Sequence, residues 1–189
     1  MPNRERVRIS PGSITLRDSN SKFMTPIQTG SYERTMREVD KTEGVIRPSA
    51  SQVLQLAYGA CQLPREAHSK KILSAFKNMG LFTSTEAYVL PKGKYFYDNP
   101  NGDKKPQRNE LEIETESGNI RFTPEDGGPI KISELEDSLL DPLLGDEEGI
   151  EYVRRLVEHL GTQRVVFSIE GGVKNTYSGS RAHTKIGTN

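Results

Sequence analysis

The hydrophobic pattern of this chain of 189 residues changes its period at Gly80. Before this glycine, apolar residues recur every three or four positions, which is typical of amphipathic helices. After it the period is two, and the segment is rich in Phe, Tyr, Thr and Val, which favours strands. We therefore predict an α+β domain in which an N-terminal helical part packs on an antiparallel β meander. A C-terminal helix and strand are predicted to complete its core.

Three helices are predicted before Gly80, over residues 31–41, 49–63 and 65–79. The second begins at Ser49, because Ser49 and Gln52 have the spacing of a capping box, in which each side chain bonds the other residue's backbone N–H. The third ends at Gly80, since glycine readily takes the left-handed conformation that closes many helices. The second and third helices are joined by a short loop at Pro64 and form a predicted αα-hairpin.

Two β-hairpins are predicted after Gly80, and they pair 81–90 with 94–98 and 110–116 with 120–123. The first turns at Pro91-Lys92-Gly93. The second turns at Ser117-Gly118-Asn119, and its first strand alternates Leu and Ile with acidic residues. Together the two hairpins form the predicted meander.

The last part of the predicted core lies between residues 133 and 170. Ser133 and Glu136 form a second capping box, at the start of a short helix that should break near Pro142. A longer helix over 147–160 follows, with acidic residues in its first turn. A strand over 164–170 contains adjacent valines, which suit an interior position.

The chain is predicted to divide into three parts. Residues 1–30 form an N-terminal arm with one or two short strands, and residues 31–170 form the single domain. Residues 171–189 are rich in Gly, Ser, Thr and Asn, so they are predicted to be a flexible C-terminal tail.

Charge is sorted along the chain, although the formal net charge is zero. Eight acidic residues and no basic residue lie between Ser133 and Tyr152, whereas arginines gather near the N-terminus. Capping and the helix dipole explain most of this acidic block. The remaining contrast predicts that the basic N-terminal residues dock on the acidic block, within one chain or between copies. The residues expected to take part are Glu147, Glu148, Glu151, Arg4, Arg6 and Arg8.

A second interpretation is nucleic-acid binding by the segment 92–108, which mixes cations with aromatic residues. Its candidate binding residues are Lys92, Lys94, Tyr95, Tyr97, Lys104, Lys105 and Arg108. Because side chains alternate along a strand, Tyr95 and Tyr97 are expected on one face and Phe96 on the other, with one of these faces exposed.

A third interpretation is a metal-dependent hydrolase or transferase that uses the acidic cluster. The sequence gives it little support, because His68, His159 and His183 are far apart and have no zinc-ligand spacing. Cys61 lies in an apolar helical run and is expected to be a buried, inert thiol. No Walker-type or dinucleotide-binding loop is present, so no cofactor is expected.

The favoured interpretation is a non-enzymatic, self-assembling or protein-binding module. A net charge of zero favours self-association, because copies repel one another only weakly. No apolar stretch approaches the roughly 20 residues that span a bilayer, so a soluble, cytoplasmic protein without a membrane partner is expected.

Overall fold

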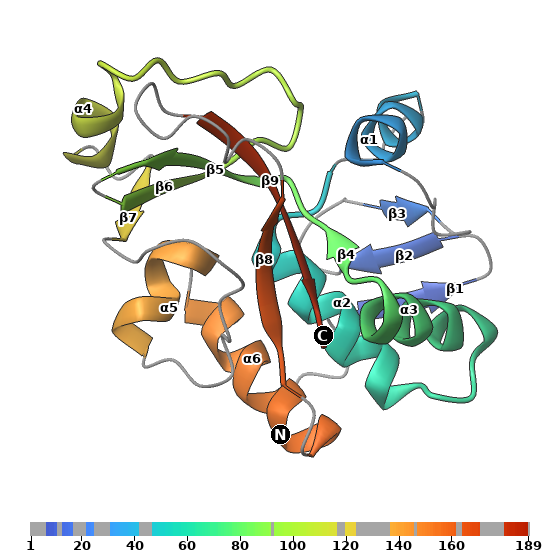
Figure 1. The fold of residues 1–189 in the computed structure, drawn as a ribbon. Helices are drawn as coiled ribbons and strands as arrows, with labels where there is room; N and C mark the ends of the chain where they lie inside the picture. Colours follow the sequence, from blue (N-terminus) through green and yellow to red (C-terminus); the bar gives the residue numbers. More distant parts are fainter. Residues whose placement is uncertain are drawn as a thin grey trace.

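The computed structural model describes residues 7–10, 13–16, 22–24, 31–41, 47–91, 93–116, 120–123, 137–145, 147–161, 164–170 and 180–188 (Figure 1). Within these ranges the chain forms six helices and two antiparallel sheets. The predicted α+β class is confirmed.

The three N-terminal helices form where the sequence predicts them, as α1 (Tyr32–Asp40), α2 (Ala50–Gln62) and α3 (Ala67–Asn78). The predicted capping box of α2 is present: the Ser49 hydroxyl accepts from the backbone N–H of Gln52, and the side-chain Oε1 of Gln52 accepts from the backbone N–H of Ser49. Gly80 follows α3 with a φ of +71°, as predicted for a residue that closes a helix.

The larger sheet has six strands, namely β4 (Leu81–Phe82), β5 (Thr85–Leu90), β6 (Gly93–Asp98), β7 (Arg121–Thr123), β8 (Val166–Glu170) and β9 (Ser180–Gly187). The meander β5-β6-β7 forms one half. Strand β9 pairs first with β5 and then lies between β8 and β4, so it joins the two halves (Figure 1). A smaller sheet contains β1 (Val7–Ser10), β2 (Ser13–Leu16) and β3 (Lys22–Met24), and β1 contacts α2 and α3.

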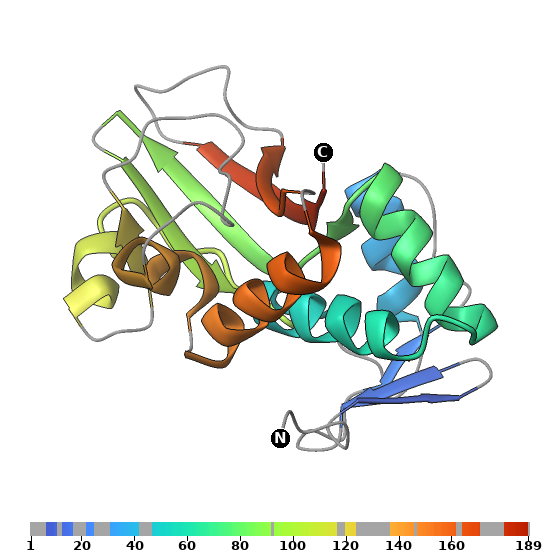
Figure 2. The same cartoon turned by 90° about the horizontal axis from the view of Figure 1, so that it is seen from below.

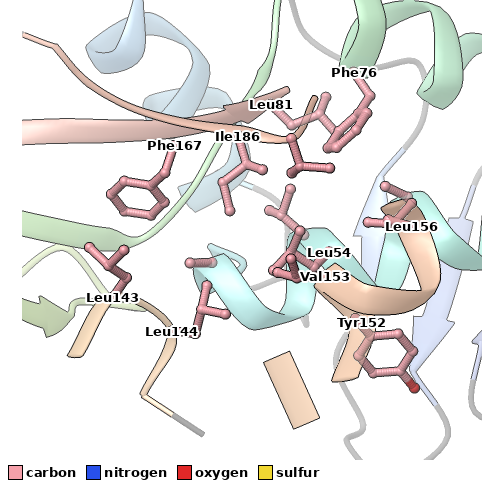
Figure 3. Packing of buried hydrophobic residues seen from close by; sticks show 14 of the residues in the cluster. Leu54, Phe76, Leu81, Leu143, Leu144, Tyr152, Val153, Leu156, Phe167 and Ile186 are labelled. Atoms are coloured by element: carbon pink, nitrogen blue, oxygen red, sulfur yellow. The ribbon is translucent and has the colours of Figure 1, made fainter. Parts of the chain in front are cut away.

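Helices cover one face of the larger sheet. On this side lie α2, α5 (Asp137–Leu144) and α6 (Glu147–Leu160) (Figure 2). Their apolar side chains meet alternate residues of the strands, such as Ala87 and Phe96, in the main core. Figure 3 shows Leu54 of α2, Val153 of α6 and Ile186 of β9 converging there.

The opposite face of the same sheet is also covered. There Leu90, Tyr95 and Tyr97 form a second buried cluster with Leu111 of α4 (Leu111–Glu116) and with Ile120. The larger sheet therefore has a buried face on each side, which its period-2 pattern did not reveal.

The predicted strand over 110–116 is wrong, because this segment begins α4 at Leu111. Its sequence LEIETE is compatible with both periods, and Leu and Glu are strong helix formers. The Glu110 carboxylate accepts from the Gln107 N–H at 2.7 Å just before the helix, and the Thr115 hydroxyl donates to the Leu111 carbonyl. Local hydrogen bonding thus favours the helical turn.

The predicted helix break near Pro142 is also wrong, because Pro142 lies inside α5. A proline removes one hydrogen bond of the helix. Leu140, Leu143 and Leu144 are each at most 2% exposed, so burial of these side chains offsets that loss. The capping box of Ser133 and Glu136 lies outside the described residues.

The largest difference concerns the predicted tail of residues 171–189, since 180–187 form β9. Ala182, Thr184 and Ile186 are buried and alternate with Arg181, His183 and Lys185. This period-2 pattern is visible in the sequence, but the Gly- and Ser-rich residues before it obscured it. Strand β8 confirms the strand predicted over 164–170.

Candidate functional site

The two tyrosines proposed to stack on bases are buried. Tyr95 is 3% exposed, Tyr97 is 0% exposed, and Phe96 on the other face is also 0% exposed. The expectation that one face of this strand is exposed is therefore wrong, because α4 and its neighbours cover the tyrosine face. Lys94 is buried too, at 2%.

The other basic residues of this segment lie nearer the surface. The Lys104 ammonium lies 5.6 Å from the centre of the Tyr97 ring, in a cation–π contact within the chain. Lys105 and Arg108 are exposed. Lys92 lies outside the described residues. The structure thus does not unite these cations with an exposed aromatic surface, and nucleic-acid binding stays a prediction.

The acidic residues proposed to dock with arginines lie on α6. Glu147 and Glu148 are exposed in its first turn, where the helix dipole favours them. Glu151 accepts from the Arg155 side chain at 2.8 Å. Arg4 and Arg6 lie outside the described residues and Arg8 belongs to β1, so docking of the two blocks stays a prediction.

Metal binding gains no support from the described residues, in which no group of three or more His, Cys, Asp or Glu side chains could hold an ion. Cys61 is 4% exposed, and burial raises the pKa of its thiol. A higher pKa means less thiolate, so this residue is a poor nucleophile.

A buried carboxylate that the sequence reasoning missed lies on β5. Glu86 is 6% exposed, and its oxygens accept hydrogen bonds from the Tyr32 hydroxyl at 3.3 Å, the Tyr97 hydroxyl at 3.0 Å and the Asn99 amide at 3.0 Å. These four residues are named the Glu86 cluster. They come from α1, β5, β6 and the turn after β6. An acidic residue inside the otherwise uncharged strand TEAYVL was the available signal.

Further contacts hold the Glu86 cluster in place. The Asn99 side chain also bonds the backbone N–H and C=O of Lys104, at 2.9 and 3.1 Å. The Tyr32 ring stacks on His183, with centroids 3.5 Å apart, and meets Phe82 edge-on. The cluster thus fastens α1 and the loop after β6 to the sheet.

The chemistry of the Glu86 cluster is that of satisfied hydrogen bonds. Burial, together with the negative charge of Glu86, raises the pKa of Tyr32 and of Tyr97. Both phenols therefore stay protonated and act as donors to the carboxylate. Three donors on one carboxylate are typical of a structural anchor, because a buried charge needs such partners.

The edges of the larger sheet offer a different kind of site. Thr83 donates its backbone N–H to the Thr184 carbonyl at 3.0 Å, so the backbone groups of Thr184 point toward β4. Neighbouring residues of a strand direct their backbone groups to opposite sides. The backbone N–H and C=O groups of Lys185 therefore point toward β8, where Lys185 pairs with Ser168.

The same alternation decides which groups of β8 point away from β9. Since Ser168 bonds toward β9, the N–H and C=O groups of Phe167 and Ile169 point outward. Within the described part of the chain, no strand and no backbone hydrogen bond meets these outward groups. This side of β8 is called the β8 edge; Phe167 is 0% exposed there, and Ile169 is partly exposed.

Comparison of the chain with protein-family models, with curated proteins and with solved structures found no match. Among the described helices, none is long and apolar enough to cross a membrane.

Proposed function

We propose that the protein is an interaction module that binds an extended polypeptide segment by strand addition at the β8 edge. The observation that supports this proposal is the backbone of Ile169, a partly exposed residue whose outward N–H and C=O groups meet no backbone partner among the described residues. An extended segment placed beside β8 can bond these groups and continue the sheet.

The sequence of the β8 edge lacks the usual protection against added strands. Natural sheets protect their edges with very short strands, prolines, lysines or bulges. Strands β4 and β7, with two and three residues, are short. Strand β8 has five residues, VFSIE, with neither proline nor lysine.

Binding at this edge does not depend on the Glu86 cluster. The three donors of that cluster are already used to hold α1 and the loop after β6, which argues against acid–base chemistry there. The proposal is therefore non-enzymatic. Each backbone hydrogen bond that an added strand makes contributes about 0.5–1.5 kcal/mol net, so several are needed for stable association.

A pair of variants at Ile169 tests the proposal. Ile169→Pro removes one outward N–H and leaves the bonds of Ser168 to β9 intact. Ile169→Ala also removes the isoleucine side chain, but it keeps the backbone N–H. The wild-type chain and both variants serve as baits in an extract of the source organism. Proteins that bind through the β8 edge are expected on the wild-type and Ala baits and are lost from the Pro bait.

Hydrogen exchange of a purified complex supplies the direct readout. The amide of Ile169, which is partly exposed in the free chain, should become protected on binding. Equal capture by all three baits, or a complex without protection at β8, would contradict the proposal. Circular dichroism must show that both variants are folded.

A further inference from the structure

We infer that the solvent face of α3 is a second interaction surface, which binds double-stranded DNA through its phosphates. This surface lies on a different element from the β8 edge, and the inference does not depend on strand addition there. Three lysines carry it, namely Lys70, Lys71 and Lys77, and all three are exposed. They are called the α3 basic face.

The inner side of α3 fixes which side of the helix meets solvent. The inner side chains belong to the main core and are at most 4% exposed, namely Ile72, Ala75 and Phe76. Helix α3 itself lies at the periphery of the molecule, as Figure 2 shows. An α-helix turns by about 100° per residue, so the three lysines fall on the side away from this core.

The three lysines have no acidic partner among the described residues. Helix α3 contains no acidic residue. Two further cations lie at its ends: Arg65 is exposed in the turn before the helix, and the side chain of Lys185 packs beside Gly80 after it. Positive charge is therefore concentrated on this face although the formal net charge is zero, and such a face attracts a polyanion.

Helix α1 shows the opposite arrangement of charge. It also exposes three cations, Arg34, Arg37 and Lys41, but they gather around the Glu38 carboxylate. The hydrogen bond from Lys41 and the charges of the two arginines lower the pKa of Glu38. The cations of α1 are thus compensated within the chain, whereas those of the α3 basic face are left for a partner.

The residues between the lysines indicate the kind of partner. Ala67 and Ser74 are exposed there, and Lys, Ser and Ala are depleted in interfaces between proteins. Binding to a membrane surface needs large apolar side chains that enter the lipid. The large apolar residues exposed in the described chain, Leu63 and Met79, lie outside α3. Phosphates need only cations and polar hydrogens, and this face has both.

The arrangement of the lysines fits the two walls of a DNA groove. Ala67 and Ser74 lie along the middle of the solvent face. At about 100° per residue, Lys71 lies on one side of this line and the other two lysines on the opposite side. The major groove of B-DNA is about 12 Å wide and admits an α-helix. The lysines can then reach phosphates of both strands, whereas the deep, narrow major groove of duplex RNA excludes the helix.

Neutralising the α3 basic face tests the inference. The variant carries Lys70→Gln, Lys71→Gln and Lys77→Gln, and it should stay folded because Gln and Lys have similar helix propensities. Fluorescence anisotropy measures binding of the full chain to a short labelled DNA duplex over a range of salt concentrations. For the wild type, the logarithm of the association constant should fall against log salt with a slope of about −3, as expected for three phosphate contacts. The variant should bind at least about tenfold more weakly and lose most of this slope.

The matched control removes the three cations of α1, through Arg34→Gln, Arg37→Gln and Lys41→Gln. It has the same net charge as the α3 variant, so it separates a local surface from the charge of the whole chain. Its affinity for DNA should equal that of the wild type. Ile169→Pro should also bind DNA normally, because the β8 edge does not belong to the α3 basic face. Circular dichroism checks that every variant is folded.

The outcomes separate this inference from the proposed function. A wild-type chain that does not bind duplex DNA at low salt overturns the inference, while capture that depends on the Ile169 N–H still supports strand addition. Equal weakening in the two triple variants also overturns it, because binding then follows net charge. Tighter binding to single-stranded DNA or duplex RNA overturns the assignment to duplex DNA. Vesicles that contain phosphatidylserine are the last arm. If the α3 lysines are needed for vesicle binding and not for DNA binding, the surface is a membrane site and the inference is wrong.

Discussion

Gly102 ends the turn after β6 with a φ of +74°, a conformation that side chains other than glycine rarely adopt. A Cβ atom at this position would overlap the guanidinium group of Arg47. Arg47 in turn forms two hydrogen bonds with Asp40 at the end of α1. The backbone thus favours glycine here, and a side chain at this position would also require the Arg47 guanidinium group to shift.

Gly102→Ala should therefore destabilise the protein more than Gly161→Ala. Gly161 has a similar φ of +67° with nothing within 4 Å of the added Cβ, so it reports backbone strain alone. We expect about 1 kcal/mol for Gly161→Ala, and about 1 kcal/mol more for Gly102→Ala because Arg47 must move. Urea unfolding measures both, and equal losses would show that Arg47 adjusts without cost.

Tyr97 predicts a loss of stability at high pH. Burial and Glu86 raise the pKa of its phenol above the usual value of about 10. Because the folded state disfavours ionisation, the stabilisation from the neutral phenol is complete below pH of about 10. It is lost as the pH rises from there toward the folded-state pKa.

Tyr97→Phe should cost about 1 kcal/mol at neutral pH, since one hydrogen bond to Glu86 is lost. Above pH of about 10 the free energy of unfolding of the wild type should fall faster than that of the variant, so the gap narrows. Urea unfolding across this pH range provides the measurement. Tyr88→Phe is the control, because Tyr88 lies on the neighbouring strand β5, on the same face of the sheet as Tyr97. A constant gap would mean that Tyr97 titrates normally.

Strand β9 is the element whose role the sequence conceals most. It pairs with β4, β5 and β8, and Ile186 on its core face is 0% exposed. Strands β4 and β5 lie about 90 residues before β9 in the sequence, so no local pattern identifies them as its partners. If residues 180–187 were a flexible tail, truncating Ile186 would hardly change the free energy of unfolding. If they form a central strand, the same mutation should lower it strongly.

Ile186→Ala should cost about 2–5 kcal/mol, because a large core side chain leaves a cavity. In a tail the same change would fall within about 0.5 kcal/mol. Met79→Ala is the control, since Met79 is 52% exposed. Thermal or urea unfolding decides between the central strand and the flexible tail. A small loss of stability in Ile186→Ala would contradict the central position of β9.

Elements with local signals were predictable, whereas elements that depend on distant contacts were not. Ser49 and Gln52 identify the start of α2 because the capping box involves residues three positions apart. The LEIETE segment of α4 suits either a helix or a strand. The break predicted at Pro142 does not occur because its neighbouring leucines are buried in the core, which is a tertiary effect.

The two ends of the chain should contribute unequally to the stability of the whole molecule. The described side chains of the main core run from Ala50 to Ile186. Deletion of residues 1–30 should leave a cooperative unfolding transition, because the described strands of this segment pair only among themselves, whereas deletion of 180–189 should abolish it, because β9 joins both halves of the larger sheet. Circular dichroism during heating compares the two truncated chains. Loss of the transition in the chain without 1–30 would show that the N-terminal arm belongs to the domain.

The sequence alone determined the α+β class, the helix start at Ser49 and the helix end at Gly80, because caps and hydrophobic periods act over a few neighbouring residues. Only the tertiary structure decided that Tyr95 and Tyr97 are buried and that, among the described strands, β8 pairs with β9 alone. Both depend on which distant segments cover a strand: Thr184 meets Thr83 across 101 positions of the chain. A period of two shows that a strand has two faces, but the packing of remote segments decides whether each face and edge is covered.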